Sequence, residues 1–283
     1  MVRVNQVIAL GAVLALSLLT AQTALAGAAG AGGDSFTVVG PGTAASPSGL
    51  GLWTTSPTGG PQNLGEYTNQ LSGPEEADYR FCASWPAGDG TVPVSVKAGP
   101  AGWLWFSNFN GTGGQTIIFG NPAVDTPTVM DTDGDGTDEI VVVRDESTWR
   151  KWIVRNTVES PVSNAASSFT FGPAGSTPVP GAWAGEGEAD KPAVTKALGG
   201  GPIKVWLYGE PDSNVATGTF NFGKAEWNAH AYTGSDGVTR PGTAHRVGLG
   251  NNVIDVAATD DPADDKRVLM GGAVRTPVGN CNL

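Results

Sequence analysis

The run Asp131-Thr-Asp-Gly-Asp-Gly136 is the part of the sequence whose residue types and spacing most clearly suggest chemistry. Its carboxylates occupy alternate positions of a tight turn, an arrangement that aims them at one point. Ca²⁺ takes about six to eight oxygen ligands, several of them anionic. The predicted ligands are Asp131, Asp133, Asp135, the carbonyl of Thr137, and Glu139. Carboxylates this close repel one another unless a cation lies between them, so the run predicts one calcium site.

Acidic runs of this kind also occur in EF-hands and in turns that bind no ion. An EF-hand requires a Glu at the twelfth position counted from Asp131, with a helix on either side. Val142 occupies that position, inside an apolar run, which excludes an EF-hand. A solvated acidic turn without an ion stays open as the alternative. Mg²⁺ is expected to compete poorly, because it requires a rigid octahedral site.

The elements that would position this turn recur along the chain. Phe119-Gly120 is followed after 52 residues by Phe171-Gly172, and after 51 more by Phe222-Gly223. Turns and short β-branched runs follow each pair. The predicted strands span residues 92–97, 103–107, 140–144, 149–155, 193–196, 203–208, 242–246 and 253–257. A period near fifty built from short strands is typical of a radially repeated all-β fold.

We therefore expect a small β-propeller of about four to five blades, with four short strands per repeat of roughly 50 residues. A pair of β-sandwiches is the alternative, but it does not explain why the Phe-Gly pairs recur. The repeats are expected within residues 76–283. The Gly-, Pro- and Ser-rich segment 27–75 is less readable and is considered as part of a further blade.

The stretch from Phe119-Gly120 through the acidic turn to Ile140–Arg144 resembles the FG-GAP or VCBS-type repeat, the blade unit of integrin-alpha-like β-propellers. The resemblance implies a calcium-binding turn followed by an apolar strand. This chain departs from the family pattern at the ninth position, where Glu139 stands in place of Asp. The corresponding turns elsewhere have lost their carboxylates, as at Ala182 and Ala184, so a single Ca²⁺ is expected.

Composition and the first residues bear on location and partners. The chain has 283 residues, a formal net charge of -11, and only 15% charged residues. An acidic chain without a Lys/Arg cluster is not expected to bind nucleic acid. Residues 1–26 have the features of a signal peptide cleaved after Ala26, which predicts a secreted protein without a membrane span and, we expect, a monomer. A membrane anchor is the alternative to cleavage.

Two further features concern Cys and aromatic residues. Cys82 and Cys281 are the chain's two cysteines, and in a secreted ring-shaped fold a disulfide between them would join the first and last units. Two separate buried thiols are the alternative. The nine Trp invite a lectin interpretation, with candidates for ligand stacking at Trp85, Trp183 and Tyr232. Strand residues Trp103, Trp149, Trp152 and Trp206 are expected to pack in the core.

These patterns favour a non-catalytic module that binds a polysaccharide or a surface protein through loops on a rigid scaffold. No catalytic residues are predicted. The two histidines, His230 and His245, lie in no recognisable catalytic motif. An extracellular carbohydrate-active enzyme is the alternative, using carboxylates such as Asp260-Asp261 and Asp264-Asp265. A purely structural surface component is the third possibility.

Overall fold

A computed structural model of the protein describes the chain in segments. They are residues 36–41, 50–55, 62–66, 79–84, 92–99, 102, 104–108, 116–155, 165, 167–185, 188–197, 202–213, 215–233, 238–247, 251–257, 266–271 and 276–279. The predicted signal peptide, residues 1–26, lies outside them. Within these segments, no helix has the length and apolar character that crossing a membrane requires.

The described residues form five antiparallel sheets of four strands each and no α-helix. Sheet 1 consists of β20 (Thr276–Gly279), β1 (Phe36–Pro41), β2 (Leu50–Thr55) and β3 (Gln62–Glu66). Sheet 2 consists of β4 (Tyr79–Ala83), β5 (Val92–Ala98), β6 (Leu104–Asn108) and β7 (Thr116–Ile118). Sheet 3 consists of β8 (Asp125–Met130), β9 (Glu139–Glu146), β10 (Trp149–Arg155) and β11 (Ser167–Pro173).

Sheet 4 consists of β12 (Thr177–Pro178), β13 (Ala193–Ala197), β14 (Ile203–Tyr208) and β15 (Gly218–Lys224). Sheet 5 consists of β16 (Asn228–Thr233), β17 (Thr239–Val247), β18 (Asn251–Val256) and β19 (Lys266–Gly271). Each of the eight predicted runs overlaps one of these strands. The all-β prediction is therefore confirmed, as is the prediction of small four-stranded units.

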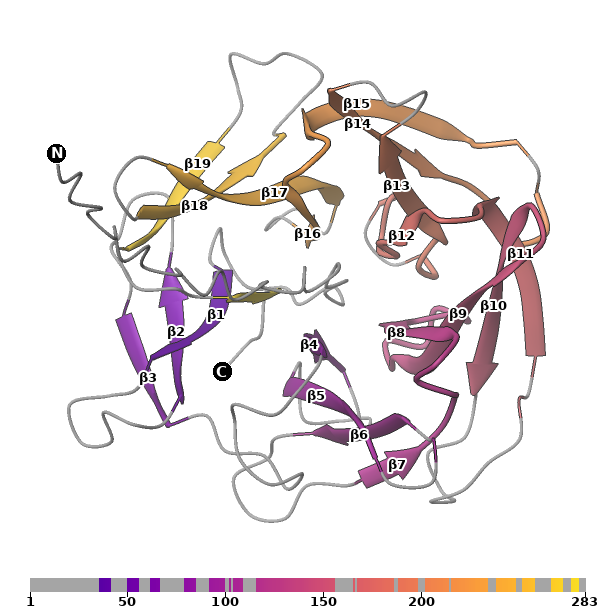
Figure 1. Cartoon of the computed structure of the whole chain (residues 1–283), viewed down its shortest axis with the longest axis horizontal. Helices are drawn as coiled ribbons and strands as arrows, with labels where there is room; N and C mark the ends of the chain where they lie inside the picture. The colour runs from indigo at the N-terminus through magenta and orange to yellow at the C-terminus, as the bar shows by residue number, and fades with distance from the viewer. Residues whose placement is uncertain are drawn as a thin grey trace, which may run out of the picture.

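The five sheets follow one another around a common centre (Figure 1). In sheets 2 to 5 the first strand, β4, β8, β12 or β16, lies nearest that centre, and the last strand lies at the rim. Neighbouring sheets contact each other through β4 and β8, β11 and β13, and β15 and β17. β20 contacts both β4 and β16, so the last strand of the chain lies beside the first strands of sheets 2 and 5.

The Phe-Gly pairs mark the joints between these sheets. Each glycine has a positive φ, 85° at Gly120, 84° at Gly172 and 76° at Gly223. A Cβ on Gly172 would lie 2.6 Å from Val194 Cγ2, on the second strand of the next sheet. Gly120 and Gly223 meet the corresponding residues of their own neighbouring sheets, Val142 and Thr243. The repeated glycine therefore allows both the turn of the backbone and the close approach of the next sheet.

The phenylalanine of the pair has a partner of its own in sheets 3 and 4. Trp152 Nε1 on β10 donates a hydrogen bond of 3.0 Å to the carbonyl of Phe171 on β11. Trp206 Nε1 on β14 donates in the same way, at 2.9 Å, to the carbonyl of Phe222 on β15. Both Trp side chains are fully buried, as predicted. The third strand is thus fastened to the fourth where the fourth meets the next sheet.

Apolar clusters fill the spaces between consecutive sheets. Phe81 and Val94 of sheet 2 pack with Val129 and Val142 of sheet 3. A second cluster combines residues of sheets 3 and 4, namely Met130, Val141, Val143, Trp152, Val154, Phe171 and Val194. A third lies between sheets 4 and 5 and contains Val179, Trp183, Ala193, Trp206, Ala229 and Ala231. The core is therefore divided among the joints rather than gathered in one place.

Two predicted features are only partly covered by the described residues. Cys82 is fully buried in β4, and none of the described cysteines is free. Cys281 lies outside the described residues, although β20 ends at Gly279 and contacts β4. The disulfide between Cys82 and Cys281 thus stays a prediction. Within the less readable segment 27–75, residues 36–66 contribute β1, β2 and β3 to sheet 1.

Candidate metal centre

The acidic turn joins the first two strands of sheet 3, β8 and β9. Carboxylate oxygens of Asp131, Asp133 and Glu139 all lie within 4.8 Å of one another. Two oxygens bound to one Ca²⁺ at about 2.3–2.6 Å can be at most about 5 Å apart, so this spacing fits a shared cation. The three side chains could therefore hold a metal ion. Glu139, the residue that departs from the family pattern, is one of them.

The backbone of the turn is shaped by the side chain of Asp131. Its two carboxylate oxygens accept hydrogen bonds from Gly134 N at 2.6 Å and Gly136 N at 2.8 Å. Both glycines have positive φ, 79° and 83°, so the chain can curl around Asp131 without strain from a Cβ. Glu139 Oε2 in turn accepts from the N–H and hydroxyl of Thr132, at 2.8 and 2.6 Å.

The other two predicted ligands, Asp135 and Thr137, are not part of the three-carboxylate group. Asp135 Oδ1 accepts a hydrogen bond of 2.7 Å from the N–H of Thr137, so these two residues interact with each other. Asp133 is exposed, and one of its oxygens faces the N–H of Asp135 at 3.3 Å. The structure therefore brings together three of the four predicted carboxylates, and the role of the Thr137 carbonyl stays a prediction.

Two buried carboxylates that were not predicted as site residues flank the turn. Asp138 accepts a hydrogen bond of 2.5 Å from Ser84 N, and its own N–H donates to Ser84 O at 2.9 Å. Asp190 accepts from Asp131 N at 3.2 Å and donates its N–H to Asp131 O at 2.7 Å. Ser84 follows β4 and Asp190 precedes β13, so the turn is bonded to sheets 2 and 4.

The charges of this region are poorly compensated by protein groups. Burial, followed by the charge of Asp190, raises the pKa of Asp138 well above its ordinary value. Burial also raises the pKa of Asp190, to about 7, and that of Glu139. Oδ1 of Asp138 is buried and has no hydrogen-bond partner. A bound cation would reverse these shifts, because it favours the ionised carboxylates.

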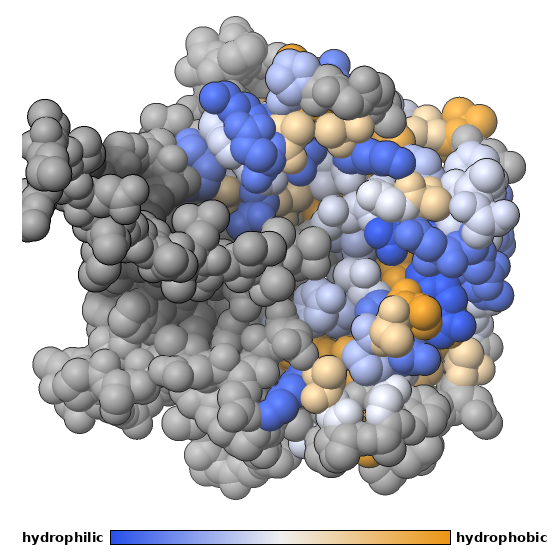
Figure 2. Space-filling view, viewed as in Figure 1, coloured by the Kyte–Doolittle hydropathy of each residue, from blue (hydrophilic) through white to orange (hydrophobic). Residues whose placement is uncertain are grey.

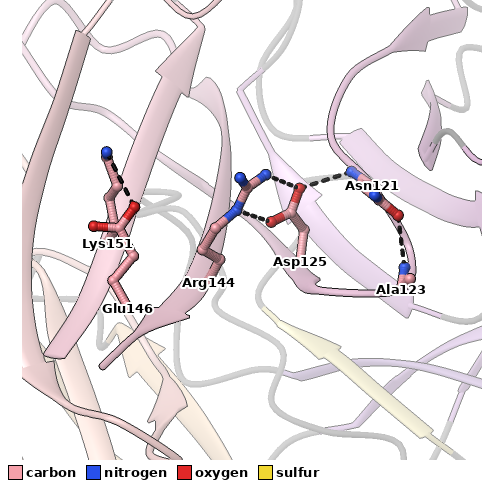
Figure 3. A network of polar contacts seen from close by, with 6 residues as sticks. All are labelled: Asn121, Ala123, Asp125, Arg144, Glu146 and Lys151. Carbon is pink, nitrogen blue, oxygen red and sulfur yellow. Dashed lines mark hydrogen bonds and ion pairs between the residues drawn. The ribbon is translucent and has the colours of Figure 1, made fainter. Parts of the chain in front are cut away.

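The hairpin that carries the turn is secured at its opposite end (Figure 3). The guanidinium of Arg144 on β9 binds both carboxylate oxygens of Asp125 on β8, at 2.7 and 2.9 Å. Asp125 also accepts a hydrogen bond of 2.7 Å from Asn121 N in the preceding connection. Because Asp125 and Arg144 are paired in the strand register, this contact holds β8 and β9 in the alignment that closes the turn.

Two of the three aromatic residues considered for ligand stacking, Trp183 and Tyr232, are buried. Trp183 is 6% exposed and packs against Trp206, Tyr208 and Phe220. Tyr232 is 4% exposed, and Trp85 lies outside the described residues. Conversely Trp149, which was expected in the core, is 38% exposed at the start of β10.

The two histidines have different surroundings. His230 on β16 is buried, and burial lowers its pKa to about 3. His245 on β17 stacks on Trp227 with ring centroids 3.6 Å apart. The acid pairs Asp260-Asp261 and Asp264-Asp265 lie outside the described residues.

On the coloured part of the face seen in Figure 2, hydrophobic residues form small separate groups among hydrophilic ones. The large hydrophobic side chains exposed in the described part of the chain are Val124, Trp149, Ile203 and Val215.

Comparisons with models of known protein families, with curated proteins and with solved structures found no match.

Proposed function

We propose that the five sheets are the blades of a closed β-propeller with FG-GAP/VCBS-like repeats. The pairing of β20 with β1 supports closure, because it builds one blade from strands at both ends of the chain. Contacts between every pair of consecutive sheets, including sheets 5 and 1, support it as well. A ring of this kind leaves only short sheet edges at its rim.

The β8–β9 turn then serves as a calcium site that stiffens the third blade. The observation that carries this proposal is the convergence of carboxylate oxygens of Asp131, Asp133 and Glu139 in a loop that is shaped by backbone hydrogen bonds to Glu139 and Asp131. These are hard oxygen ligands in an irregular turn, and Ca²⁺ accepts such an arrangement more readily than Mg²⁺, which requires near-octahedral geometry. When bound, the ion would neutralise repulsion among the carboxylates.

Calcium is expected to raise the thermal unfolding midpoint of the mature protein. At a free concentration of a hundred times Kd, one site stabilises the native state by about 2.7 kcal/mol. For a domain of this size that corresponds to a midpoint shift of about 5–10 °C. The measurement is a thermal melt in EDTA, in Ca²⁺ and in Mg²⁺.

The variant Asp133→Ala should abolish the shift, because it removes one of the three proposed carboxylate ligands. The fold should be little affected, because the Asp133 side chain is exposed and its bond to Asp135 N is long, at 3.3 Å. Glu146→Ala is the matched control: it removes an exposed acid at the far end of the same hairpin, where Glu146 pairs with Lys151 at 3.1 Å. A midpoint unaffected by Ca²⁺ in the wild-type protein would contradict the calcium site.

On this scaffold the protein acts as a secreted, non-catalytic module that binds a polysaccharide or a surface protein through its loops. The state of His230 supports a non-catalytic role for this residue, since a buried imidazole with a pKa of about 3 is a poor general base at neutral pH. The family resemblance supports a binding scaffold rather than a particular ligand.

Binding to an array of extracellular polysaccharides and to immobilised surface proteins, with Ca²⁺ present, tests this function. We expect retention of at least one ligand class, without turnover and weaker in EDTA. Asp133→Ala should reproduce the effect of EDTA, and Glu146→Ala should not. Release of reducing ends from a bound polysaccharide would contradict the binding role and favour the carbohydrate-active enzyme.

A further inference from the structure

The bonds between Asp190 and Asp131 belong to a pattern that recurs at three joints between sheets. In each case the backbone N–H of the residue that precedes or begins the second strand of a sheet donates to a carbonyl of the preceding sheet. The three pairs are Asp138 N to Ser84 O at 2.9 Å, Asp190 N to Asp131 O at 2.7 Å, and Thr239 N to Ala182 O at 3.0 Å. The donor residues are 52 and 49 residues apart, matching the repeat.

In two of these joints a carboxylate completes a second bond. Asp138 accepts from Ser84 N, and Asp190 accepts from Asp131 N. Asp190 therefore occupies the position equivalent to Asp138, and not that of the proposed ligand Glu139. Aligning the two turns in sequence on Asp131 and Ala182 would instead pair Asp190 with Glu139, one residue away. The Asp190 carboxylate accepts a hydrogen bond from the turn of the preceding sheet, sheet 3.

The joint at Asp190 differs from the other two because its hydrogen-bond partner, Asp131, is a candidate metal ligand. Asp190 bonds both the N–H and the carbonyl of Asp131, whose side chain belongs to the three-carboxylate group. A Cβ on Gly134 would lie 3.3 Å from Ala189 N, so the metal turn also packs on the backbone beside Asp190. Asp190 itself is buried, which limits the freedom of both partners.

We propose that Asp190 of sheet 4 is a positioning residue for the metal site of sheet 3. By holding the peptide groups on both sides of the Asp131 Cα, it fixes the direction in which the Asp131 side chain leaves the backbone. Metal binding by sheet 3 and docking of sheet 4 are then coupled, and the coupling acts in both directions. This inference rests on the proposed calcium site.

Calcium titration of the mature protein by calorimetry tests the coupling, at a temperature where thermal melts show each variant folded. Asp190→Ala removes the acceptor for Asp131 N–H and should raise the Kd for Ca²⁺ about tenfold or more, as loss of an outer partner of a metal ligand does. Asp190→Asn keeps an acceptor oxygen without the charge, and should bind close to the wild-type value.

Asp212→Ala is the matched control. Asp212 makes the same two bonds across the joint of sheets 3 and 4, accepting from Thr170 N at 2.9 Å and donating to Thr170 O at 3.0 Å, but away from the metal turn. This variant should bind Ca²⁺ as the wild type does. Affinity unchanged in Asp190→Ala, or reduced equally in Asp190→Asn, would overturn the positioning role while leaving the calcium site intact.

Hydrogen exchange supplies the reciprocal readout. Ca²⁺ should slow exchange of the amides of Asp131 and Asp190, and leave that of Asp212 unchanged. Equal exchange at Asp190 with and without Ca²⁺ would overturn the coupling. No calcium binding by the wild-type protein would overturn the calcium site itself, a result distinct from a site that binds without Asp190.

Discussion

Replacing Trp152 by Ala should lower the free energy of unfolding by about 3–5 kcal/mol, the range for a fully buried Trp. Trp152 is 0% exposed, stacks on Phe169 with centroids 5.7 Å apart, and donates to the carbonyl of Phe171. Its loss would leave a cavity between sheets 3 and 4 and an unpartnered buried carbonyl. Denaturant unfolding of the calcium-free protein measures the change.

Trp149→Ala is the internal control for this prediction. It removes the same side chain type from the same strand, but Trp149 is partly exposed, so the expected loss is below about 1 kcal/mol. Trp152→Phe keeps an aromatic ring and loses the indole donor, and should fall between the two. Equal losses for Trp152→Ala and Trp149→Ala would show that the joint between sheets 3 and 4 is not packed as described.

Replacing Gly172 by Ala should destabilise the protein by about 2–4 kcal/mol, because backbone strain and overpacking act together. The residue has a φ of 84°, and its Cβ would lie 2.6 and 2.7 Å from the two Cγ atoms of Val194. β11 and β13 would have to separate to admit the new methyl group. Urea unfolding gives the size of the effect.

The two causes can be separated with a second glycine. Gly102 has a φ of 75°, yet a Cβ there would meet nothing within 4 Å. Gly102→Ala should therefore cost only the backbone strain, about 1–2 kcal/mol. Adding Val194→Ala to Gly172→Ala should recover part of the packing loss, so the two changes should be less than additive. Strict additivity would argue against a steric clash at this joint.

The second and third strands of sheets 2 to 5 could be predicted from the sequence because each repeat contains its own signals, whereas the first and fourth strands were not located individually. Short β-branched runs, closed by glycine or proline, lie at similar distances from each Phe-Gly pair. Sheet 1 was harder to predict because its segment has no Phe-Gly pair. The strand that pairs with β1 at the edge of this sheet, β20, is also far from β1 in the sequence. Pairing between such distant segments leaves no local sequence pattern.

The residues of the candidate site also fall into those that the sequence could predict and those that it could not. Asp131, Asp133 and Glu139 lie in one short loop, so their spacing alone predicted that they would converge. Asp138 and Asp190 were missed as site residues because their partners, Ser84 and Asp131, are 54 and 59 residues away. Trp149 was expected in the core because strand position alone does not tell which side chains at a hairpin end reach solvent.

The pairing of β20 with β1 also has a consequence for the order in which the chain acquires its structure. Synthesis proceeds from the N-terminus, so β1 emerges early but the edge that pairs with β20 remains unpaired until β20 has been made. An unpaired strand edge is a template for association with other chains. The interval before the last strand arrives is thus when the protein is most vulnerable to misassembly, and chaperone protection would matter most then.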